Sequence, residues 1–328
     1  RMIISYTILF LKRPIIFVRF LRLEKKDGIP IRSRWENLFL NNHILTENLG
    51  WLHFGFATMA IKRENVACAI GARMGVSLRG YDICVYPLKH PGCYQRLWDK
   101  IDKVHSISSD LLVAAQEQGL TGNIPQITIQ PAIDVDYFNS GEKNWIKFNG
   151  KETIHFLTVA RLHWKKGLEY TLQALAILKE KNILFQYTII GEGLERERLM
   201  FAVHQLGLKD RVTFAGSIPH QDIRKYYKEA DIYLQYSIQE GFCNAVLEAQ
   251  AMGLMTIVSD AEGLAENVIH GETGWVVPKM KPKILTKFVI DVINLEKKNK
   301  ISLNARKRVL RKFNIDNQTK LFNAFYSC

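Results

Sequence analysis

Between residues 154 and 269, short apolar segments alternate regularly with amphipathic ones, and this alternation points to a single class of fold. Each apolar run has the length of a strand, and each is followed by a segment with helical periodicity. Repeated strand–helix units of this kind predict a parallel sheet with helices on both faces. The predicted strands are 154–160, 185–190, 211–215, 231–236 and 255–258, and the predicted helices are 168–180, 194–206, 220–229, 244–252 and 264–269.

The first half of the chain has a looser alternation of the same kind. A polar stretch without periodicity, residues 137–152, is typical of a linker and divides the sequence. At 328 residues, the chain has the length of about two domains. We therefore predict an α/β protein with an N-terminal domain over 1–138, a second domain over 139–310 and a last helix over 311–328. In the first half, the predicted elements are helices over 55–72 and 108–118 and strands over 75–78, 103–107 and 127–129.

The apolar segments and the cysteines exclude several classes of protein. The longest apolar stretch, Met2–Leu11, is followed directly by two basic residues and a proline, so it is too short to span a membrane. No cleavage site for a signal peptide follows it. The five cysteines are scattered and none forms a Cys-x-x-Cys pair, which argues against zinc ribbons and thioredoxin-type sites. Reduced thiols in a cytoplasmic protein are the expected state.

The net charge of +13 is concentrated at the two ends of the chain. Residues 1–34 contain nine Lys or Arg and two Asp or Glu, a net charge of +7. Residues 279–328 contain thirteen and three, a net charge of +10, so the body between carries −4. No basic stripe with interleaved aromatics and no known module indicates nucleic-acid binding. Basic ends beside apolar residues suit an anionic membrane surface, and the alternative is that they are merely solvated.

Ligands of open α/β sheets bind at the carboxyl ends of the strands, so the loops there hold the candidate site. After strand 154–160, Arg161 and Lys166 stand just before a predicted helix. Cations at a helix N-terminus suit a phosphate-rich ligand, because Arg binds phosphate oxygens in bidentate fashion and Lys acts as a point charge. The alternative is a solvated basic turn. After strand 185–190, Gly191-Glu192-Gly193 permits close approach of a ligand or makes a tight turn, and we favour the turn.

The loop after strand 231–236 holds two carboxylates. Glu240 precedes the next helix, Glu248 lies about one turn inside it, and Asn244 suits the N-cap position. Backbone N–H groups at this helix N-terminus could take phosphate oxygens, and the carboxylates could accept hydrogen bonds from sugar hydroxyls. For Glu248 alone the alternative is a favourable charge at the helix dipole, and for Glu240 alone it is a loop charge.

Four segments in the second half together resemble the family 4, or group 1, glycosyltransferases. Residues 240–253 (EGFCNAVLEAQAMG) resemble the E-x7-E signature of that family, and residues 159–167 (VARLHWKKG) resemble its G-R-L-x-x-x-K-G segment. Residues 259–266 (SDAEGLAE) are similar to its T-D-x-G-G-x-x-E segment, and 271–277 (GETGWVV) to its G-x-x-G-x-L-V strand. The four occur in the order and spacing of the family, which is far more specific than any one of them.

The first half resembles, more loosely, the members of this family that make exopolysaccharides such as colanic acid. Residues 52–55 (LHFG) and 78–83 (LRGYDI) look like their H-F-G and F-H-G-Y-D-I segments, with Arg79 in place of the usual histidine. On this resemblance we place Arg79 and Asp82 on the acceptor side. The family's first strand and glycine-rich first loop have no counterpart after Arg1, so we expect a truncated N-terminal domain.

The resemblance implies a GT-B fold, in which two Rossmann-like domains face each other across a cleft and the C-terminal one binds a nucleotide-sugar. It also implies that the last helix crosses back to the N-terminal domain. Carried over by position, Glu240 contacts the transferred sugar and Glu248 the nucleotide ribose, while the backbone of 241–244 helps to hold sugar and phosphate. The predicted catalytic residues are Arg161 and Lys166, on the diphosphate, and Glu240. The predicted donor-binding residues are Gly191, Gly241, Phe242, Cys243, Asn244 and Glu248.

The implied reaction is that of a retaining hexosyltransferase. It would use a UDP- or GDP-sugar, extend a saccharide or lipid-linked saccharide at the cytoplasmic membrane face, and form no covalent enzyme intermediate. Asp134-Val135-Asp136 spells the D-x-D metal motif of another glycosyltransferase class, but it follows Pro131 near the domain junction and we interpret it as structural. We expect no obligatory metal and no other cofactor, because cationic side chains can do the neutralisation that Mg²⁺ does elsewhere. The alternative is an inactive nucleotide-sugar-binding remnant or scaffold subunit.

Overall fold

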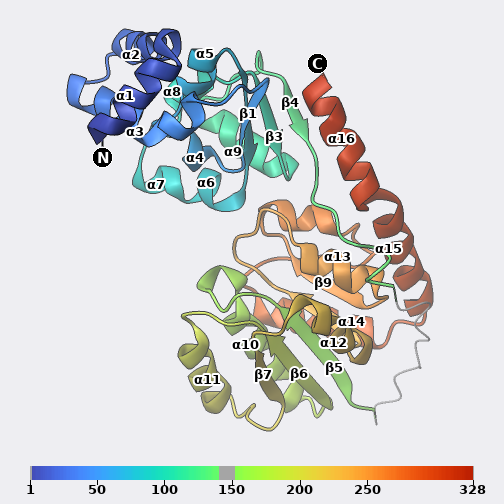
Figure 1. Cartoon of the computed structure of the whole chain (residues 1–328). Coiled ribbons are helices and arrows are strands. Elements are labelled where there is room, and N and C mark those ends of the chain that lie inside the picture. The colour runs from blue at the N-terminus through green and yellow to red at the C-terminus, as the bar shows by residue number, and fades with distance from the viewer. Residues whose placement is uncertain (1, 140–151, 328) are drawn as a thin grey trace. The chain divides into compact units, whose positions relative to one another are not determined.

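The computed structural model of the chain describes residues 2–139 and 152–327, which fall into two compact units (Figure 1). The first unit comprises residues 1–129 and 324–328, and the second comprises 130–323. The division therefore comes before the predicted boundary at residue 138, because residues 130–138 pack on the second unit. Ile133 N donates to Phe313 O at 3.0 Å, and the buried Phe138 ring lies edge-on to Tyr227. Most of the predicted linker lies outside the described residues.

The first unit is built on four parallel strands in the order β1-β2-β3-β4. The strands are β1 (Trp51–Phe54), β2 (Arg73–Leu78), β3 (Lys103–Ser106) and β4 (Gln126–Thr128). Helices connect them: α4 (Ala57–Ala60), α5 (Val66–Ile70), α6 (Gly80–Cys84), α7 (Tyr86–Lys89), α8 (Gln95–Trp98) and α9 (Ser109–Glu117). The helix predicted over 55–72 is thus two short helices, since the chain turns at Lys62, whose φ of 66° is left-handed.

Three longer helices precede β1: α1 (Met2–Lys12), α2 (Pro14–Lys26) and α3 (Ile31–Leu45). Their inner faces bury Leu9, Phe20 and Leu38 completely. Glu24 on α2 is also buried, and its carboxylate accepts hydrogen bonds from Asn37 and Asn65. None of the helices in the described ranges is both long and apolar enough to cross a membrane.

The second unit is a sheet of six parallel strands in the order β10-β9-β8-β5-β6-β7. Its strands are β5 (Ile154–Val159), β6 (Phe185–Ile190), β7 (Val212–Gly216), β8 (Ile232–Gln235), β9 (Met255–Ser259) and β10 (Trp275–Val277). Its helices are α10 (Leu168–Glu180), α11 (Arg196–Gln205), α12 (Ile223–Glu229), α13 (Asn244–Ala251), α14 (Pro282–Ile293) and α15 (Lys298–Lys312), and the helix predicted over 264–269 is a 3₁₀ segment, η3 (Glu262–Asn267).

The strand order of the second unit has a switch point between β5 and β8. From β5 the chain moves outward through β6 and β7, and then returns to the other side of β5 to form β8, β9 and β10. Connections therefore leave β5 and β8 in opposite directions, and in open α/β sheets ligands bind at the carboxyl ends of the strands at such a point. The loop after β5 carries Arg161 and Lys166, and the loop after β8 carries Glu240.

The last helix, α16 (Ile315–Ser327), ends in the first unit. Its final residues pack on the first sheet, where Lys103 Nζ donates to Phe325 O at 2.7 Å and Trp51 Nε1 donates to Tyr326 O at 3.2 Å. The Phe325 ring is 1% exposed. The sequence after residue 310 therefore forms the end of α15 and all of α16.

Candidate active site

The loops after β5 and β8 are held against each other by backbone contacts. Ile238 N donates to Lys165 O at 2.7 Å. Gly167 has a φ of 60°, and a Cβ there would lie 2.1 Å from Tyr236 O. Because both the left-handed conformation and the close approach require glycine, Gly167 fixes where the cationic loop ends and α10 begins.

Lys166 and Glu240 form an ion pair at the switch point. Each side chain is only 15% exposed. Burial lowers the pKa of Lys166, but the charge of the Glu240 carboxylate and its hydrogen bond raise it, and the pKa lies above its ordinary value. The lysine is therefore charged at neutral pH. The structure brings together one predicted phosphate-binding residue and one predicted sugar-binding residue.

Arg161 lies in the same loop and is exposed. It makes no ion pair and no side-chain hydrogen bond with the residues that the structure describes. Beside it, burial and the charges of Lys165 and Arg161 lower the pKa of His163, which favours the neutral imidazole. The loop thus offers an unpaired guanidinium to an anionic ligand.

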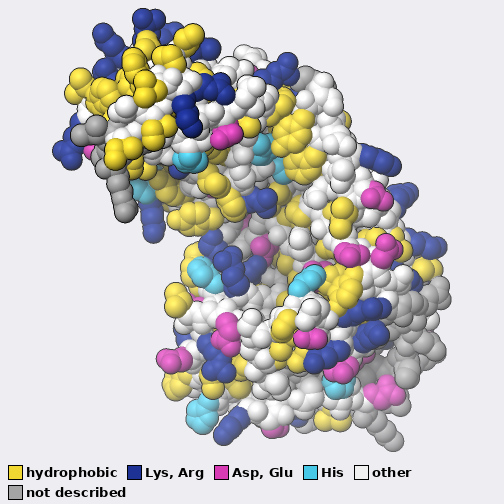
Figure 2. Space-filling model, viewed as in Figure 1, with side chains coloured by type: hydrophobic (Ala, Val, Ile, Leu, Met, Phe, Trp, Pro, Cys, Tyr) yellow, Lys and Arg dark blue, Asp and Glu magenta, His cyan; other side chains and the backbone are white. Residues whose placement is uncertain are grey.

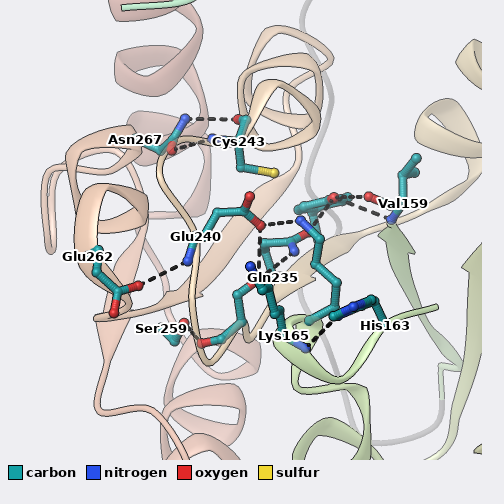
Figure 3. Close-up of polar contacts among 12 residues, drawn as sticks. Val159, His163, Lys165, Gln235, Glu240, Cys243, Ser259, Glu262 and Asn267 are labelled. Atoms are coloured by element: carbon teal, nitrogen blue, oxygen red, sulfur yellow. Dashed lines mark hydrogen bonds and ion pairs between the residues drawn. The ribbon is translucent and has the colours of Figure 1, made fainter. Parts of the chain in front are cut away.

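The Glu240 backbone is held by Glu262 and Lys279, which are not among the predicted site residues. Glu240 N donates to Glu262 Oε2 at 3.0 Å (Figure 3), and Glu262 Oε1 pairs with Lys279 Nζ at 3.2 Å. Lys279 Nζ also donates to Ile238 O at 3.1 Å. Glu262 stands where the T-D-x-G-G pattern has its first glycine, and its φ of 24° is positive. That departure from the pattern was the signal that could have identified the pair.

Asn267 fixes the N-terminus of α13 from the loop after β9. Its Oδ1 accepts from Cys243 N at 3.1 Å and its Nδ2 donates to Cys243 O at 2.9 Å (Figure 3). Cys243 is the N-cap of α13 and Asn244 is its first helical residue, so the prediction of Asn244 as N-cap is wrong. The Asn267 amide already positions the backbone at this point. Asn244 remains exposed at the start of the helix.

The other predicted residues of this loop face the protein interior. The Phe242 ring is 7% exposed and packs against Phe313, with ring centroids 5.8 Å apart. Burial raises the pKa of Cys243 to about 12, so its thiol stays protonated. Gly241 is buried as well. Of residues 241–243, only the backbone is therefore placed to meet a ligand, and its contact with sugar and phosphate stays a prediction.

Glu248 is 7% exposed, one turn into α13. Its carboxylate accepts a hydrogen bond from Tyr227 OH at 2.8 Å and lies 3.2 Å from His220 Nε2. The Tyr227 side chain is fully buried, whereas that of His220 is 66% exposed. Glu248 Oε2 is thus held by Tyr227 from inside the protein. Glu248 Oε1 contacts the exposed His220 at the surface, where a ligand could displace the imidazole. Neither Tyr227 nor His220 belongs to a recognisable motif, so sequence reasoning did not assign them to the site.

Gly191 is explained by packing between loops. Its φ is 134°, and a Cβ there would lie 2.0 Å from Ala160 O. A Cβ on Gly193 would lie 2.2 Å from Leu162 O. These glycines let the loop after β6 pack against the cationic loop after β5, which agrees with the tight-turn interpretation. The predicted contact between Gly191 and a donor stays a prediction.

Arg79 and Asp82, predicted for the acceptor side, lie at the carboxyl end of β2 in the first unit. Asp82 is fully buried, and its carboxylate accepts from Ala57 N at 2.7 Å and Arg79 N at 2.9 Å. Burial raises the pKa of Asp82 to about 6. Arg79 Nε donates to Gly55 O at 3.0 Å, and its guanidinium lies over Phe56. Both residues therefore brace the loop that follows β1.

Asp134 and Asp136, the D-x-D sequence, lie in a turn of the second unit. Asp134 Oδ1 accepts from Asp136 N at 3.1 Å and from Tyr137 N at 2.9 Å. This contact accounts for Asp134 as a turn residue. Across residues 2–139 and 152–327, no three His, Cys, Asp or Glu side chains are grouped so that they could hold a metal ion.

Two parallel sheets, with a cationic loop beside a helix N-terminus at a switch point, place the chain among Rossmann-like α/β proteins. Residues 141–308 match the family described as Glycosyl transferases group 1. The chain belongs to this family, as its motifs predict.

Curated relatives agree with this assignment. The amylovoran biosynthesis glycosyltransferase AmsK of Erwinia amylovora is 31% identical over 240 residues, which are 70% of this chain and 57% of AmsK. The putative colanic acid biosynthesis glycosyltransferase WcaL of Salmonella typhimurium is 30% identical over 169 residues, which are 49% of this chain and 42% of WcaL. The chain spans about half the length of these relatives.

Solved structures confirm the fold class. A glycosyltransferase from Rickettsia africae has a TM-score of 0.73 at 19% identity, covering 91% of this chain and 81% of that one. HepE of Anabaena, solved in complex with UDP, has a TM-score of 0.76 at 16% identity, covering 88% and 82%. The fold is therefore GT-B, with two Rossmann-like α/β units in one chain.

Proposed function

We propose that this chain is a retaining hexosyltransferase that takes its sugar from a UDP- or GDP-sugar. The observation that carries the proposal is the Lys166–Glu240 pair at the switch point, with Glu248 one turn into the adjoining helix. A sugar-binding carboxylate, a phosphate-binding cation and a ribose-binding carboxylate then correspond to the successive parts of a single donor. HepE, which shares the fold, is known in complexes with UDP and UDP-glucose.

Charge stabilisation would drive the transfer. Cleavage of the bond between sugar and phosphate adds negative charge to the leaving diphosphate, and Arg161, Lys166 and the α13 N-terminus would stabilise it. Glu240 would hold the sugar through its hydroxyls. The Cys243 thiol, a possible nucleophile by residue type, is buried and protonated. A substitution on one face of the sugar, without a covalent enzyme intermediate, fits this arrangement.

We further propose that transfer needs no metal ion. The positive charge that Mg²⁺ brings to a diphosphate elsewhere would come from Arg161 and Lys166. The free guanidinium of Arg161 is suited to bidentate contact with phosphate oxygens.

For the acceptor, we propose a growing saccharide or lipid-linked saccharide at the cytoplasmic face of the plasma membrane. The relatives AmsK and WcaL are named for the biosynthesis of amylovoran and colanic acid, which supports a polysaccharide product. Arg79 and Asp82 would act on this side by fixing the loops after β1 and β2.

The first unit has a surface that suits an anionic membrane. Hydrophobic and basic side chains gather over α1–α3 in Figure 2. Leu9 and Phe20 of these helices are fully buried in the core, so they do not belong to this surface. The exposed apolar residues of this surface are Ile4, Ile8, Phe10, Leu11, Ile15 and Ile31, and Leu11 and Ile15 are 74% and 80% exposed. Lys12, Arg19 and Arg22 are exposed among them, so apolar contact and positive charge coincide.

Thermal-shift measurements on the 328-residue chain with a panel of UDP- and GDP-sugars test the proposal. An active transferase should be stabilised by one donor and by its free nucleotide, and should release that nucleotide slowly by donor hydrolysis. Stabilisation without release, even with saccharide acceptors present, would favour the inactive remnant or scaffold subunit. If no member of the panel stabilises the chain, the result contradicts nucleotide-sugar binding itself.

A further inference from the structure

A line of buried polar side chains runs through the centre of the second sheet and ends at Glu240. Tyr233, Gln235 and Ser237 alternate along β8 and just beyond it, so all three side chains lie on one face of the strand. Each is fully buried. Polar groups in the middle of a sheet are costly unless they are hydrogen-bonded, and such networks help to specify one arrangement of a core.

The hydrogen bonds of this line all run in one direction, each group donating to the next. Tyr233 OH accepts from Val159 N at 3.3 Å and donates to Gln235 Oε1 at 2.9 Å, with Val159 O as a second acceptor at 3.2 Å. Because the Gln235 oxygen faces Tyr233, its Nε2 faces forward and donates to Ser237 Oγ at 2.9 Å. Ser237 has a single proton, which it donates to Glu240 Oε2 at 3.2 Å.

The same carboxylate oxygen of Glu240 is also the partner of Lys166. If Lys166 is to neutralise a diphosphate, its charge must be shared with the ligand, and Glu240 then needs another donor to keep its position. Ser237 is that donor. The orientation of its hydroxyl does not depend on the ligand, because Gln235, itself held by Tyr233, donates to Ser237 Oγ from within the core.

We propose that Ser237, oriented by Gln235 and Tyr233, is a positioning residue that fixes the Glu240 carboxylate for the donor sugar. The inference rests on the proposed function, in which Glu240 contacts the transferred sugar. Its consequence is selective: loss of the Ser237 hydroxyl should affect the sugar part of the donor and leave the nucleotide part unchanged.

The test is calorimetric titration of the full chain with UDP-glucose and with UDP, or with GDP-mannose and GDP if the wild type binds the guanine pair. Ser237→Ala should weaken the nucleotide-sugar about tenfold and the free nucleotide by less than twofold, because one hydrogen bond to a charged group is lost. Ser237→Thr keeps the hydroxyl and should stay within about threefold of wild type for both.

Two further variants separate positioning from general stability. Ser302→Ala removes another buried hydroxyl of the same unit, which donates to Gly253 O at 2.7 Å, and should leave both affinities unchanged. Gln235→Leu leaves Ser237 in place but lets the Ser237 hydroxyl rotate away from Glu240. It should therefore weaken the nucleotide-sugar selectively, by a smaller factor than Ser237→Ala. The inference is overturned if Ser237→Ala weakens nucleotide and nucleotide-sugar equally, or weakens neither. A wild type that binds neither pair would overturn the proposed function and this inference together.

Discussion

Lys166 and Arg161 illustrate how neighbouring cations of one loop differ at the scale of single residues. Lys166 is mostly buried and paired with Glu240, whereas Arg161 is exposed and unpaired among the described residues. A bound diphosphate already carries charge, so part of the attraction acts equally on the ground state and the transition state and changes affinity alone. Only the additional charge that develops on bond cleavage lets these residues accelerate transfer.

We expect Arg161→Ala and Lys166→Ala each to lower turnover at saturating donor by about 10²–10³, the usual cost of removing a preorganised stabiliser of developing charge. Lys166→Arg should not restore the full rate, because a planar guanidinium cannot occupy the place of a compact ammonium. The measurement is donor-saturated transfer, or donor hydrolysis. Alanine variants that keep wild-type turnover and differ only in KM would show that these residues merely anchor the substrate.

At the scale of elements, glycines decide how closely the loops of the second unit can pack. Gly167→Ala and Gly191→Ala would each place a Cβ within 2.1 Å of a carbonyl oxygen in a left-handed backbone conformation. We expect each to cost about 2–4 kcal/mol and to lower Tm by roughly 5–15 °C. Gly122→Ala is the control, since its Cβ would meet nothing within 4 Å and its φ is ordinary. A Gly191 variant with wild-type Tm and weakened donor binding would reverse our interpretation of that glycine.

The elements of the second unit could be predicted where local signals agree. Helix α10 and strand β6 have the predicted bounds, because an apolar run or an amphipathic period coincides with the flanking turn residues.

In the first unit, strand β1 is absent from the predicted elements, since it has only four residues and every second one is partly exposed. The long helix expected after it is interrupted at Lys62, where the carbonyl accepts from Asn41 of α3. That contact depends on tertiary structure and leaves no periodic signal.

In the candidate site, too, residues marked by local sequence signals could be predicted, and residues that act through tertiary contacts could not. Arg161, Lys166, Glu240 and Glu248 could be placed from spacing and motifs, because each lies in a loop at the carboxyl end of a strand or in the first turns of the helix that follows. Asn267 could not, since it acts on Cys243, which lies in the loop after a different strand. The direction of the Tyr233–Gln235–Ser237 line likewise depends on how β8 lies beside β5.

At the scale of the whole molecule, the basic and apolar surface over α1–α3 makes membrane association testable. Changing Lys12, Arg13, Arg19 and Arg22 to Ala should remove most binding to vesicles of phosphatidylglycerol and phosphatidylcholine, because each basic residue near an anionic surface contributes about 1 kcal/mol. The control removes four exposed lysines of the second unit: Lys181, Lys209, Lys225 and Lys228. Cosedimentation that is insensitive to salt, or equal losses in both variants, would contradict a specific electrostatic surface on the first unit.

Under the proposed function, one loop-and-helix segment binds the two halves of a nucleotide-sugar with two different carboxylates. Calorimetric titration of Glu240→Gln and Glu248→Gln, with the nucleotide-sugar that binds the wild type and with its free nucleotide, tests it directly. Glu248→Gln should weaken both ligands, by about tenfold or more, because the ribose is common to them. Glu240→Gln should weaken only the nucleotide-sugar. Equal losses of affinity for the free nucleotide in the two variants would contradict this division of roles.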